Sequence, residues 1–116
     1  RNASEHLLKA LKTFHDNGDK EKEAVTRMFL GLAYFNLESY NDSVKESLEA
    51  AAQFKMLGDE EGRGKSIGTA GGAYLHLYER RNAYRCWKEA VEILTAVGSP
   101  EAITFQKNLD LNFPKS

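Results

Sequence analysis

The chain has 116 residues, of which 41% are apolar and 28% are charged, and this composition is typical of a folded domain rather than of a disordered segment. Its 16 basic and 17 acidic side chains give a formal net charge of −1, so no overall positive field attracts nucleic acid or acidic lipid. No apolar run approaches the roughly 20 residues that span a bilayer, which argues against membrane insertion. The single cysteine, Cys86, cannot form an internal disulfide, and we therefore expect a reducing, cytoplasmic compartment.

The periodicity of the apolar residues predicts helices throughout. Leu30, Ala33 and Leu37 recur at the three- and four-residue spacing of a helix face. Proline occurs only twice, at Pro100 and Pro114, so most of the chain lacks the residue that interrupts helices. In chain order, helices are expected at residues 3–17, 20–37, 42–57, 60–77 and 82–97, and then from Pro100 onward. Asn41 or Asp42 and Asn82 are the expected N-caps of the helices at 42–57 and 82–97.

An internal repeat of 40 residues organises these helices. Gly18, Gly58 and Gly98 recur at this spacing, each where a helix is expected to end. Residues 18–57 align with residues 58–97 without a gap, and nine positions are identical. These are Gly18/Gly58, Asp19/Asp59, Glu21/Glu61, Gly31/Gly71, Ala33/Ala73, Tyr34/Tyr74, Leu37/Leu77, Glu49/Glu89 and Ala50/Ala90.

The same register extends to both ends of the chain and predicts a single domain over residues 1–116. Residues 1–17 correspond to the second helix of a preceding unit, 18–57 and 58–97 are full repeats, 98–113 form a closing helix, and 114–116 form a tail. A chain that opens with the second helix of a unit leads us to expect further repeats upstream.

The small and large residues of each unit carry a family resemblance. Gly31, Tyr34, Leu37, Tyr40 and Ala50 in the first unit, and Gly71, Tyr74, Leu77, Ala83, Trp87 and Ala90 in the second, resemble the tetratricopeptide repeat (TPR). The resemblance implies an all-α fold, an α-solenoid of antiparallel helix hairpins with a right-handed superhelix and about six helices. The 40-residue unit is similar to that of the Pins/LGN-type adaptors. Arg27, Ser43 and Ser47 depart from the pattern, and we expect a looser core in the first unit.

The resemblance also implies a protein-interaction module, an adaptor or scaffold that binds a partner peptide or helix in a concave groove lined by the first helices of the units. The groove residues would be Val25, Met28, Leu32, Phe35, Asn36, Lys65, Gly68, Gly72, Leu75, His76 and Asn108. The alternative is that Met28, Leu32 and Phe35 only pack against the adjoining second helices. Some family members clamp a terminal carboxylate with a lysine and an asparagine, but Met28, Leu32, Gly68 and Gly72 stand at those places here.

Glycines are unusually frequent in the helix at residues 60–77. Gly64, Gly68 and Gly72 form one stripe, although an interior glycine costs about 0.5–1 kcal/mol relative to alanine. A partner backbone resting on the stripe would explain it, and alanine at Gly68 and Gly72 would then weaken binding while stabilising the helix. The alternative is that large side chains of neighbouring helices fill the stripe.

Other functions remain as alternatives. Self-association through exposed terminal helices, giving a homodimer, is the main one, and a regulatory segment of a larger enzyme is a distant one. Arg81, Arg85 and Lys88 share a helix face that would meet an acidic partner or simply face solvent. The three histidines lie on separate elements, without the spacing of metal ligands, so we expect no catalytic residue, no metal and no cofactor.

Overall fold

The computed structural model describes residues 2–115, and within them every regular element is an α-helix. Predictions that fall on Arg1 and Ser116 lie outside the described residues. The helices are α1 (Asn2–Asp16), α2 (Lys20–Asn36), α3 (Tyr40–Leu57), α4 (Glu60–His76), α5 (Arg80–Ala96) and α6 (Glu101–Asn112). The prediction of an all-α fold with about six helices is confirmed.

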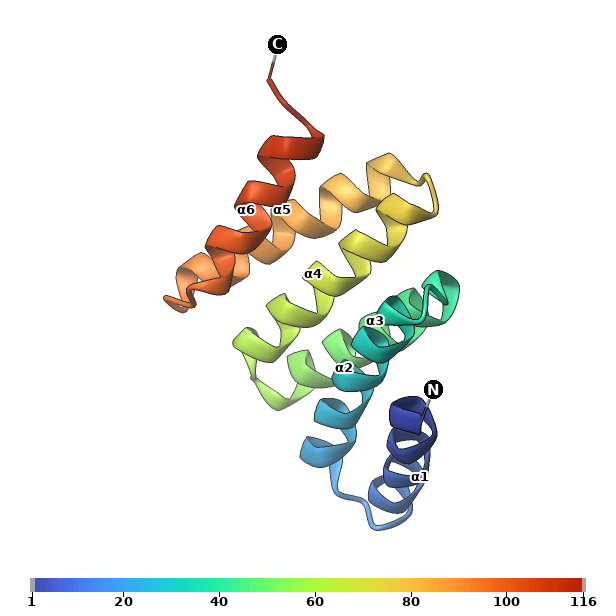
Figure 1. The fold of residues 1–116 in the computed structure, drawn as a ribbon. Helices are drawn as coiled ribbons and strands as arrows, with labels where there is room; N and C mark the ends of the chain where they lie inside the picture. Colours follow the sequence, from blue (N-terminus) through green and yellow to red (C-terminus); the bar gives the residue numbers. More distant parts are fainter. Residues whose placement is uncertain (1, 116) are drawn as a thin grey trace.

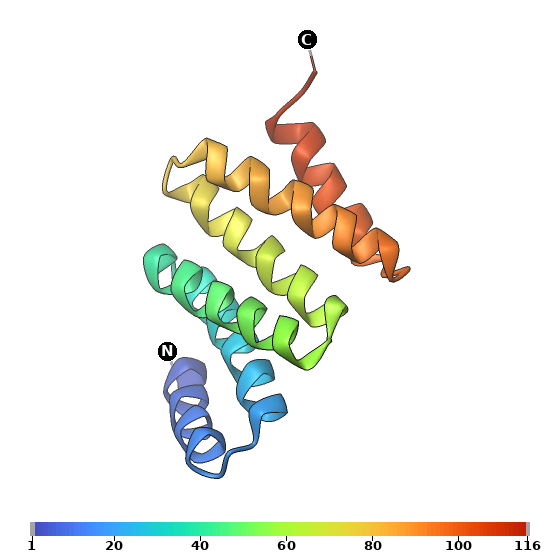
Figure 2. The same cartoon turned by 180° about the vertical axis from the view of Figure 1, so that it is seen from behind.

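Each helix packs against the next one along the chain, and α2 also packs against α4. Successive helices run in opposite directions and follow one another from the N-terminal to the C-terminal end of an elongated body (Figures 1 and 2). Its principal extents are 50 × 29 × 19 Å. The elongation follows from the contacts, because each helix is held mainly by its neighbours in sequence. Along this body α2, α4 and α6 share one side, and they position the site described below (Figure 1).

The same backbone turn follows each of the first five helices. Gly18, Gly58 and Gly98 take left-handed φ angles of 70°, 77° and 73°, as their predicted role in ending a helix requires. The equivalent residues of the other two turns are Glu38 and Tyr78, both with φ of 64°. At every turn the next residue donates its N–H to a carbonyl five residues back, at 2.8–3.0 Å. This is the Schellman arrangement.

Two of the three helix starts that follow the glycine turns are capped by side chains, whereas α6 has Pro100 at its cap position and no side-chain cap bond. Asp19 accepts a hydrogen bond from the N–H of Lys22 at 3.2 Å, and Asp59 accepts one from the N–H of Gly62 at 2.9 Å. Both carboxylates therefore satisfy amides that the helix itself leaves free.

The predicted caps of α3 and α5 are wrong. Both helices begin earlier than expected, and the cap positions are Ser39 and Glu79, neither of which makes a side-chain cap bond. Asn82 lies inside the first turn and donates to Glu79 at 2.8 Å. The error arose because Glu38 and Tyr78 adopt the left-handed turn in place of glycine, which shortens the connection to three residues.

An apolar core joins the second unit to α3 and α6. It consists of Ala51, Ile67, Ala90, Ile93, Leu94 and Ala102, with Cys86 and Phe105 packed at its edge. Trp87 is buried and donates its indole N–H to the backbone oxygen of Gly68 at 3.0 Å.

The first unit has a smaller apolar cluster of Ala24, Ala50 and Phe54, supplemented by buried polar groups. Ser43 Oγ donates to the backbone oxygen of Gly31 at 2.7 Å, and Ser47 packs directly on Gly31. The residues that depart from the TPR pattern therefore bring polar groups into this core.

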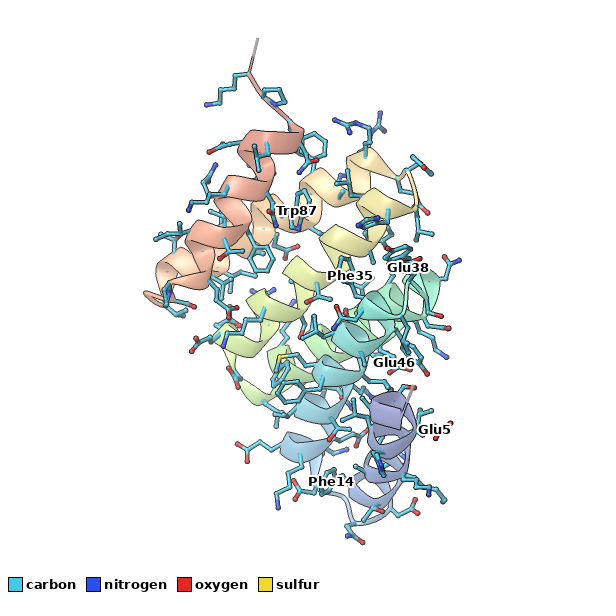
Figure 3. All side chains as sticks on the ribbon, in the orientation of Figure 1. Glu5, Phe14, Phe35, Glu38, Glu46 and Trp87 are labelled. Carbon is cyan, nitrogen blue, oxygen red and sulfur yellow. The ribbon has the colours of Figure 1, made fainter. Side chains whose placement is uncertain are left out.

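An ion network joins α1, α2 and α3. Arg27 binds Glu46 at 2.9 Å and Glu23 at 3.4 Å, while Gln53 and His15 contact Glu23 at 3.0 and 3.3 Å. Burial alone would raise the Glu23 pKa, but the hydrogen bonds from Gln53 and His15, together with the nearby charges, hold it below its ordinary value. Glu46, labelled in Figure 3, lies on α3 and pairs with Arg27 of α2.

Candidate functional site

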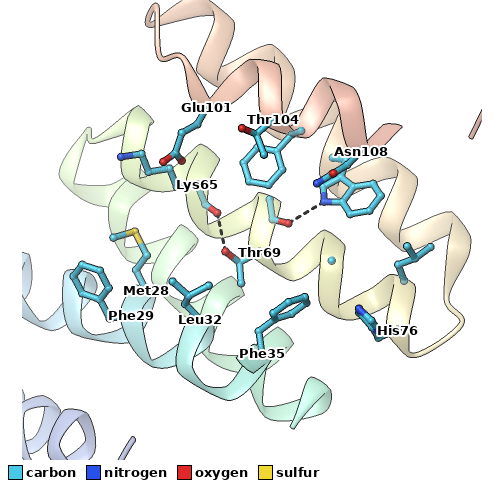
Figure 4. A pocket seen from close by; sticks show the side chains of 15 residues that line it. Met28, Phe29, Leu32, Phe35, Lys65, Thr69, His76, Glu101, Thr104 and Asn108 are labelled. Carbon is cyan, nitrogen blue, oxygen red and sulfur yellow. Dashed lines mark hydrogen bonds between the residues drawn. The ribbon is translucent and has the colours of Figure 1, made fainter. Parts of the chain in front are cut away.

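An open groove of about 570 Å³ lies between α2, α4 and α6. One wall is apolar and comes from α2, with Met28, Phe29, Leu32 and Phe35. The facing wall comes from α6 and carries polar groups, with Glu101, Thr104 and Asn108 (Figure 4). Helix α4 forms the floor between them. The groove is therefore apolar along α2 and mixed along α6, where Phe105 lies among the polar groups.

Most of the residues predicted for the groove line it. These are Met28, Leu32, Phe35, Lys65, Gly68, Gly72, Leu75, His76 and Asn108. Val25 lies instead in a smaller hollow with Phe14 and Phe54, and Asn36 lies in a shallow one between α1 and α2. Phe29 and Leu32 line that shallow hollow as well as the groove, so the apolar surface of α2 continues toward α1.

The groove is also lined by residues that the repeat did not predict, namely Phe29, Thr69, Trp87, Glu101, Thr104 and Phe105. The repeat contained a signal for Phe105, because it stands 40 residues after Lys65. Phe29 lies one position beyond Met28 and three before Leu32, at the edge of the predicted stripe. No comparable signal existed for Trp87, which reaches the groove from α5 beneath α4.

The α2 wall keeps large apolar side chains exposed. Phe29 is 50% exposed and Leu32 is 45% exposed, whereas the neighbouring Leu30 is fully buried in the core. Met28 packs against the first-unit core, as the alternative of packing on a second helix describes, whereas Phe35 lies against Gly72 of α4. Phe29 and Leu32 remain available for contact with another molecule.

The glycine stripe of α4 is filled by side chains of the same chain. The ring of Phe105 lies directly on Gly68, and Phe35 lies at 3.1 Å from the position of a Cβ on Gly72. Leu94 lies 2.7 Å from the position of a Cβ on Gly64. The second explanation of the stripe, packing by neighbouring helices, is therefore the observed one. An alanine methyl group at Gly68 would require the Phe105 ring to move, which opposes the expected gain in helix stability.

Phe35 and His76, which line the groove, form an aromatic cluster with Tyr40. Tyr40 and His76 stack with their ring centroids 4.5 Å apart and their planes 4° apart. Phe35 meets both rings edge-on at 5.5 Å. Since Phe35 and Tyr40 flank the turn between α2 and α3 and His76 ends α4, the cluster fixes the two units to each other at this end.

Polar groups along the groove keep hydrogen-bonding capacity. Lys65 pairs with Glu61 at 3.4 Å, and Thr69 donates back to the carbonyl of Lys65 at 3.2 Å (Figure 4). Within the described residues, the side-chain amide of Asn108 makes no hydrogen bond, although its backbone oxygen accepts one from Asn112. Asn108 thus keeps an amide donor and an amide acceptor in the groove.

The remaining candidates do not assemble into a second site. Burial, followed by the charge of Glu89, raises the pKa of Cys86 to about 11. Arg80 donates to the carbonyl of Asn112 at 2.7 Å and lies over Phe113, so it secures the end of α6. Arg81 and Arg85 are exposed on α5. Across residues 2–115, no three His, Cys, Asp or Glu side chains are grouped to hold a metal ion, and none of the helices is both long and apolar enough to cross a membrane.

The chain was compared with known proteins. No family model matches this sequence, and no curated protein is similar enough to it to count as a relative.

Proposed function

We propose that this chain is a TPR-like interaction module, an adaptor or scaffold that holds a partner peptide or helix in the groove between α2, α4 and α6. In this proposal the helix hairpins form an α-solenoid with a right-handed superhelix. Equivalent contacts that recur at a spacing of 40 residues support this arrangement. Ser47 packs on Gly31 in the first unit, and Trp87 packs on Gly71 in the second.

The observation that carries the proposal is the exposed apolar wall of α2. Burying a side chain of the size of Leu32 or Phe29 contributes about 1.5–3 kcal/mol, part of which offsets the cost of ordering the partner. Asn108, Thr104 and Lys65 supply polar contacts along the groove and would fix the register of the bound segment.

The test is peptide selection against the whole chain, using a random peptide library displayed on phage. Selected peptides are then titrated against the native chain and against Phe29→Glu and Leu32→Glu by fluorescence anisotropy. Each substitution should weaken binding at least about tenfold, because it places a charge on the apolar wall. Met56→Glu is the matched control, since Met56 is 88% exposed and lies outside the groove. Equal binding by all variants would refute the proposal.

Self-association is a second candidate, and the exposed face of α6 favours it. Ile103 is 61% exposed and Leu111 is 80% exposed, and neither lines the groove. Light scattering of the native chain decides this candidate. A dimer that Ile103→Glu and Leu111→Glu convert to a monomer would support it, and a monomer at all concentrations tested would exclude it.

We also propose a cytoplasmic location and a binding role without catalysis. The single cysteine is compatible with a reducing compartment. Its raised pKa keeps the thiol protonated and weakly nucleophilic at neutral pH.

A further inference from the structure

The two terminal helices lack a neighbour that the inner helices have. Each helix from α2 to α5 packs on the helix before it and the helix after it, whereas α1 packs on α2 and α6 packs on α5, at opposite ends of the body (Figure 1). The 40-residue register places α1 with the second helices α3 and α5, and α6 with the first helices α2 and α4. Within residues 2–115, α1 is therefore a second helix without its first, and α6 is a first helix without its second.

The face of α1 that would meet a first helix carries small and apolar residues that stay accessible. Ala10 is only half-buried, although the equivalent Ala50 and Ala90 are fully buried. On the same face, Ala3 is exposed and Leu7 is half-buried. The residues of α3 and α5 that are equivalent to Ala3 and Leu7 are all buried, namely Ser43, Ser47, Ala83 and Trp87. The face of α1 thus has the character of a helix contact that no helix in the described residues makes.

The face of α6 that would meet a second helix is uncovered as well. Leu111 is 80% exposed, whereas the equivalent glycines, Gly31 and Gly71, are buried against α3 and α5. Ile103 is 61% exposed two turns earlier on the same face. The face also carries three exposed polar residues, Gln106, Lys107 and Asp110.

Hollows lie beside both uncovered faces. Between α5 and α6, a hollow of about 620 Å³ is lined by Tyr84 and Val91 of α5 and by Asp110 of α6, among others. Between α1 and α2, Leu7 and Leu32 line the shallow hollow described above. Around the equivalent pair, α3 and α4, helix α5 packs on one side and helix α2 on the other. The two hollows therefore lie where the missing helices of the repeat would pack.

We infer that copies of this chain join head to tail, with α1 of one copy packed on α6 of the next, so that the two helices complete a 40-residue unit across the junction. This inference goes beyond peptide binding and specifies how the self-association named above takes place. The same surface of α1 and the same surface of α6 are used at every junction.

Contacts within the second unit give the register of the junction. Trp87 packs on Gly71, and the equivalent pair across the junction is Leu7 with Leu111. The apolar bulk that Trp87 supplies opposite a glycine is there divided between two leucines, which keeps this contact apolar. Burial of Leu7 and Leu111 against each other is the main source of binding energy at the junction.

The polar residues of α6 are compatible with a covered face. Lys107 stands at the position of Arg27, whose side chain is only 19% exposed because it pairs with Glu46 of α3. The residue of α1 equivalent to Glu46 is His6. Its neutral imidazole can accept a hydrogen bond from the Lys107 ammonium, while the lysine stem covers apolar surface.

The contact joins two different surfaces and is therefore heterologous. A pair of copies keeps one uncovered α1 and one uncovered α6, so further copies add at either end and the assembly stays open. Ile103, Lys107 and Leu111 do not line the groove. Assembly and peptide binding thus use separate faces of α6, and each can be tested without the other.

The experiment is light scattering of the 116-residue chain with two complementary variants. Leu7→Glu changes the α1 face and Leu111→Glu changes the α6 face. The matched control is Met56→Glu, because Met56 is 88% exposed and lies on neither face. Particle mass is measured over a concentration series for each chain alone and for an equal mixture of the two variants. Circular dichroism verifies folding, and Ala3→Glu, at an exposed position, is a second variant of the α1 face.

The mass of the native chain and of Met56→Glu should increase with concentration and pass that of a dimer. Leu7→Glu, Ala3→Glu and Leu111→Glu should each stay monomeric over the same range, because a charge at the centre of the contact weakens it at least about tenfold. The mixture of Leu7→Glu and Leu111→Glu should form particles of two chains and no more. In that pair, the intact α6 of one variant meets the intact α1 of the other, which also shows that both variants are folded.

Three outcomes would overturn the inference. A native chain that is monomeric at every concentration would refute self-association of any kind. A native chain that stops at a dimer, and that still dimerises as Leu7→Glu, would show a symmetric contact between α6 helices in place of the head-to-tail one. A mixture of the two variants that stays monomeric while the native chain assembles would also refute the junction. Peptide binding in the groove stands or falls separately, by the response to Phe29→Glu and Leu32→Glu.

Discussion

The indole nitrogen of Trp87 donates a hydrogen bond to the backbone oxygen of Gly68, 3.0 Å away, while the same ring lies against Gly71. Forty residues earlier, Ser47 takes the place of Trp87, and Ser43 bonds the backbone oxygen of Gly31 instead. The two helix pairs thus pack closely at equivalent positions. The contact is mainly apolar in the second unit, through the Trp87 ring, and polar in the first, through Ser43 and Ser47. This difference leads to several measurable consequences.

Replacing Trp87 with phenylalanine should lower the free energy of unfolding by about 2 kcal/mol, because the change removes both the hydrogen bond and part of the packed ring. Chemical denaturation measures the effect. The equivalent change in the first unit, Ser47→Ala, should cost much less, since the Ser47 hydroxyl has no hydrogen-bond partner within the described residues. A larger loss for Ser47→Ala than for Trp87→Phe would contradict this description of the two crossings.

Two adjacent glycines should differ in their response to alanine. A Cβ on Gly71 would lie 2.6 Å from the Trp87 ring, so Gly71→Ala should destabilise by about 1–3 kcal/mol. A Cβ on Gly72 would approach only the edge of the Phe35 ring, at 3.1 Å, and Phe35 is not fully buried. Gly72→Ala should therefore be close to neutral, because a gain of up to about 1 kcal/mol in helix propensity offsets the contact. Thermal unfolding of the two variants compares them directly.

The ion network around Glu23 should make the fold sensitive to acid. The folded-state pKa of Glu23 lies below the ordinary value of 4.5, so the unfolded chain binds its proton at a higher pH. Its contribution to stability is present above the ordinary value and is lost as the pH falls through the folded pKa. Urea denaturation between neutral and acidic pH should show a smaller pH-dependent loss in Glu23→Gln. Identical pH profiles for the native chain and the variant would argue against this contribution.

Cys86 should react slowly with alkylating reagents in the folded chain. With a pKa of about 11, about one thiol in ten thousand is ionised at pH 7. The alkylation rate should rise with pH toward that value, while the denatured chain should react quickly at neutral pH. Because the pKa is raised on folding, the thiol's contribution to stability is lost as pH rises from about 9 through 11. Rapid alkylation of the native chain at pH 7 would show that the thiol is not held in this environment.

The left-handed turn at Tyr78 should tolerate glycine. Tyr78 has φ of 64° and is 91% exposed, so its side chain contributes little packing while its backbone is strained. Tyr78→Gly should leave the free energy of unfolding unchanged or raise it by up to about 1 kcal/mol, after the entropic cost of glycine is subtracted. Thermal unfolding measures this change, and Tyr84→Gly, inside α5, should be destabilising by comparison.

The repeat explains why so much of the helical architecture could be predicted from the sequence. Gly18, Gly58 and Gly98 identify three of the five turns, because only glycine enters the left-handed conformation at little cost. The other two turns place Glu38 and Tyr78 in that conformation. No local sequence pattern predicts a left-handed backbone at these two residues. The starts of α3 and α5 were consequently predicted two residues late.

The groove could be predicted only in part. The stripe from Met28 to Phe35 and its equivalents at Lys65, Gly68 and Gly72 follow from helical spacing and the repeat. Which large side chain covers which glycine depends on how neighbouring helices pack, as with Phe105 on Gly68. That relationship joins residues far apart in sequence, and spacing within one helix contains no information about it.

The central claim is that the face of α2, α4 and α6 holds a peptide. The most direct measurement is the change in amide chemical shifts when a selected peptide is added to the isotope-labelled chain. We predict that the shifts concentrate at Phe29, Leu32 and Thr69 and at the groove side of α6. Shifts confined to the outer faces of α3 and α5, or to the exposed surface around Leu111, would contradict the claim.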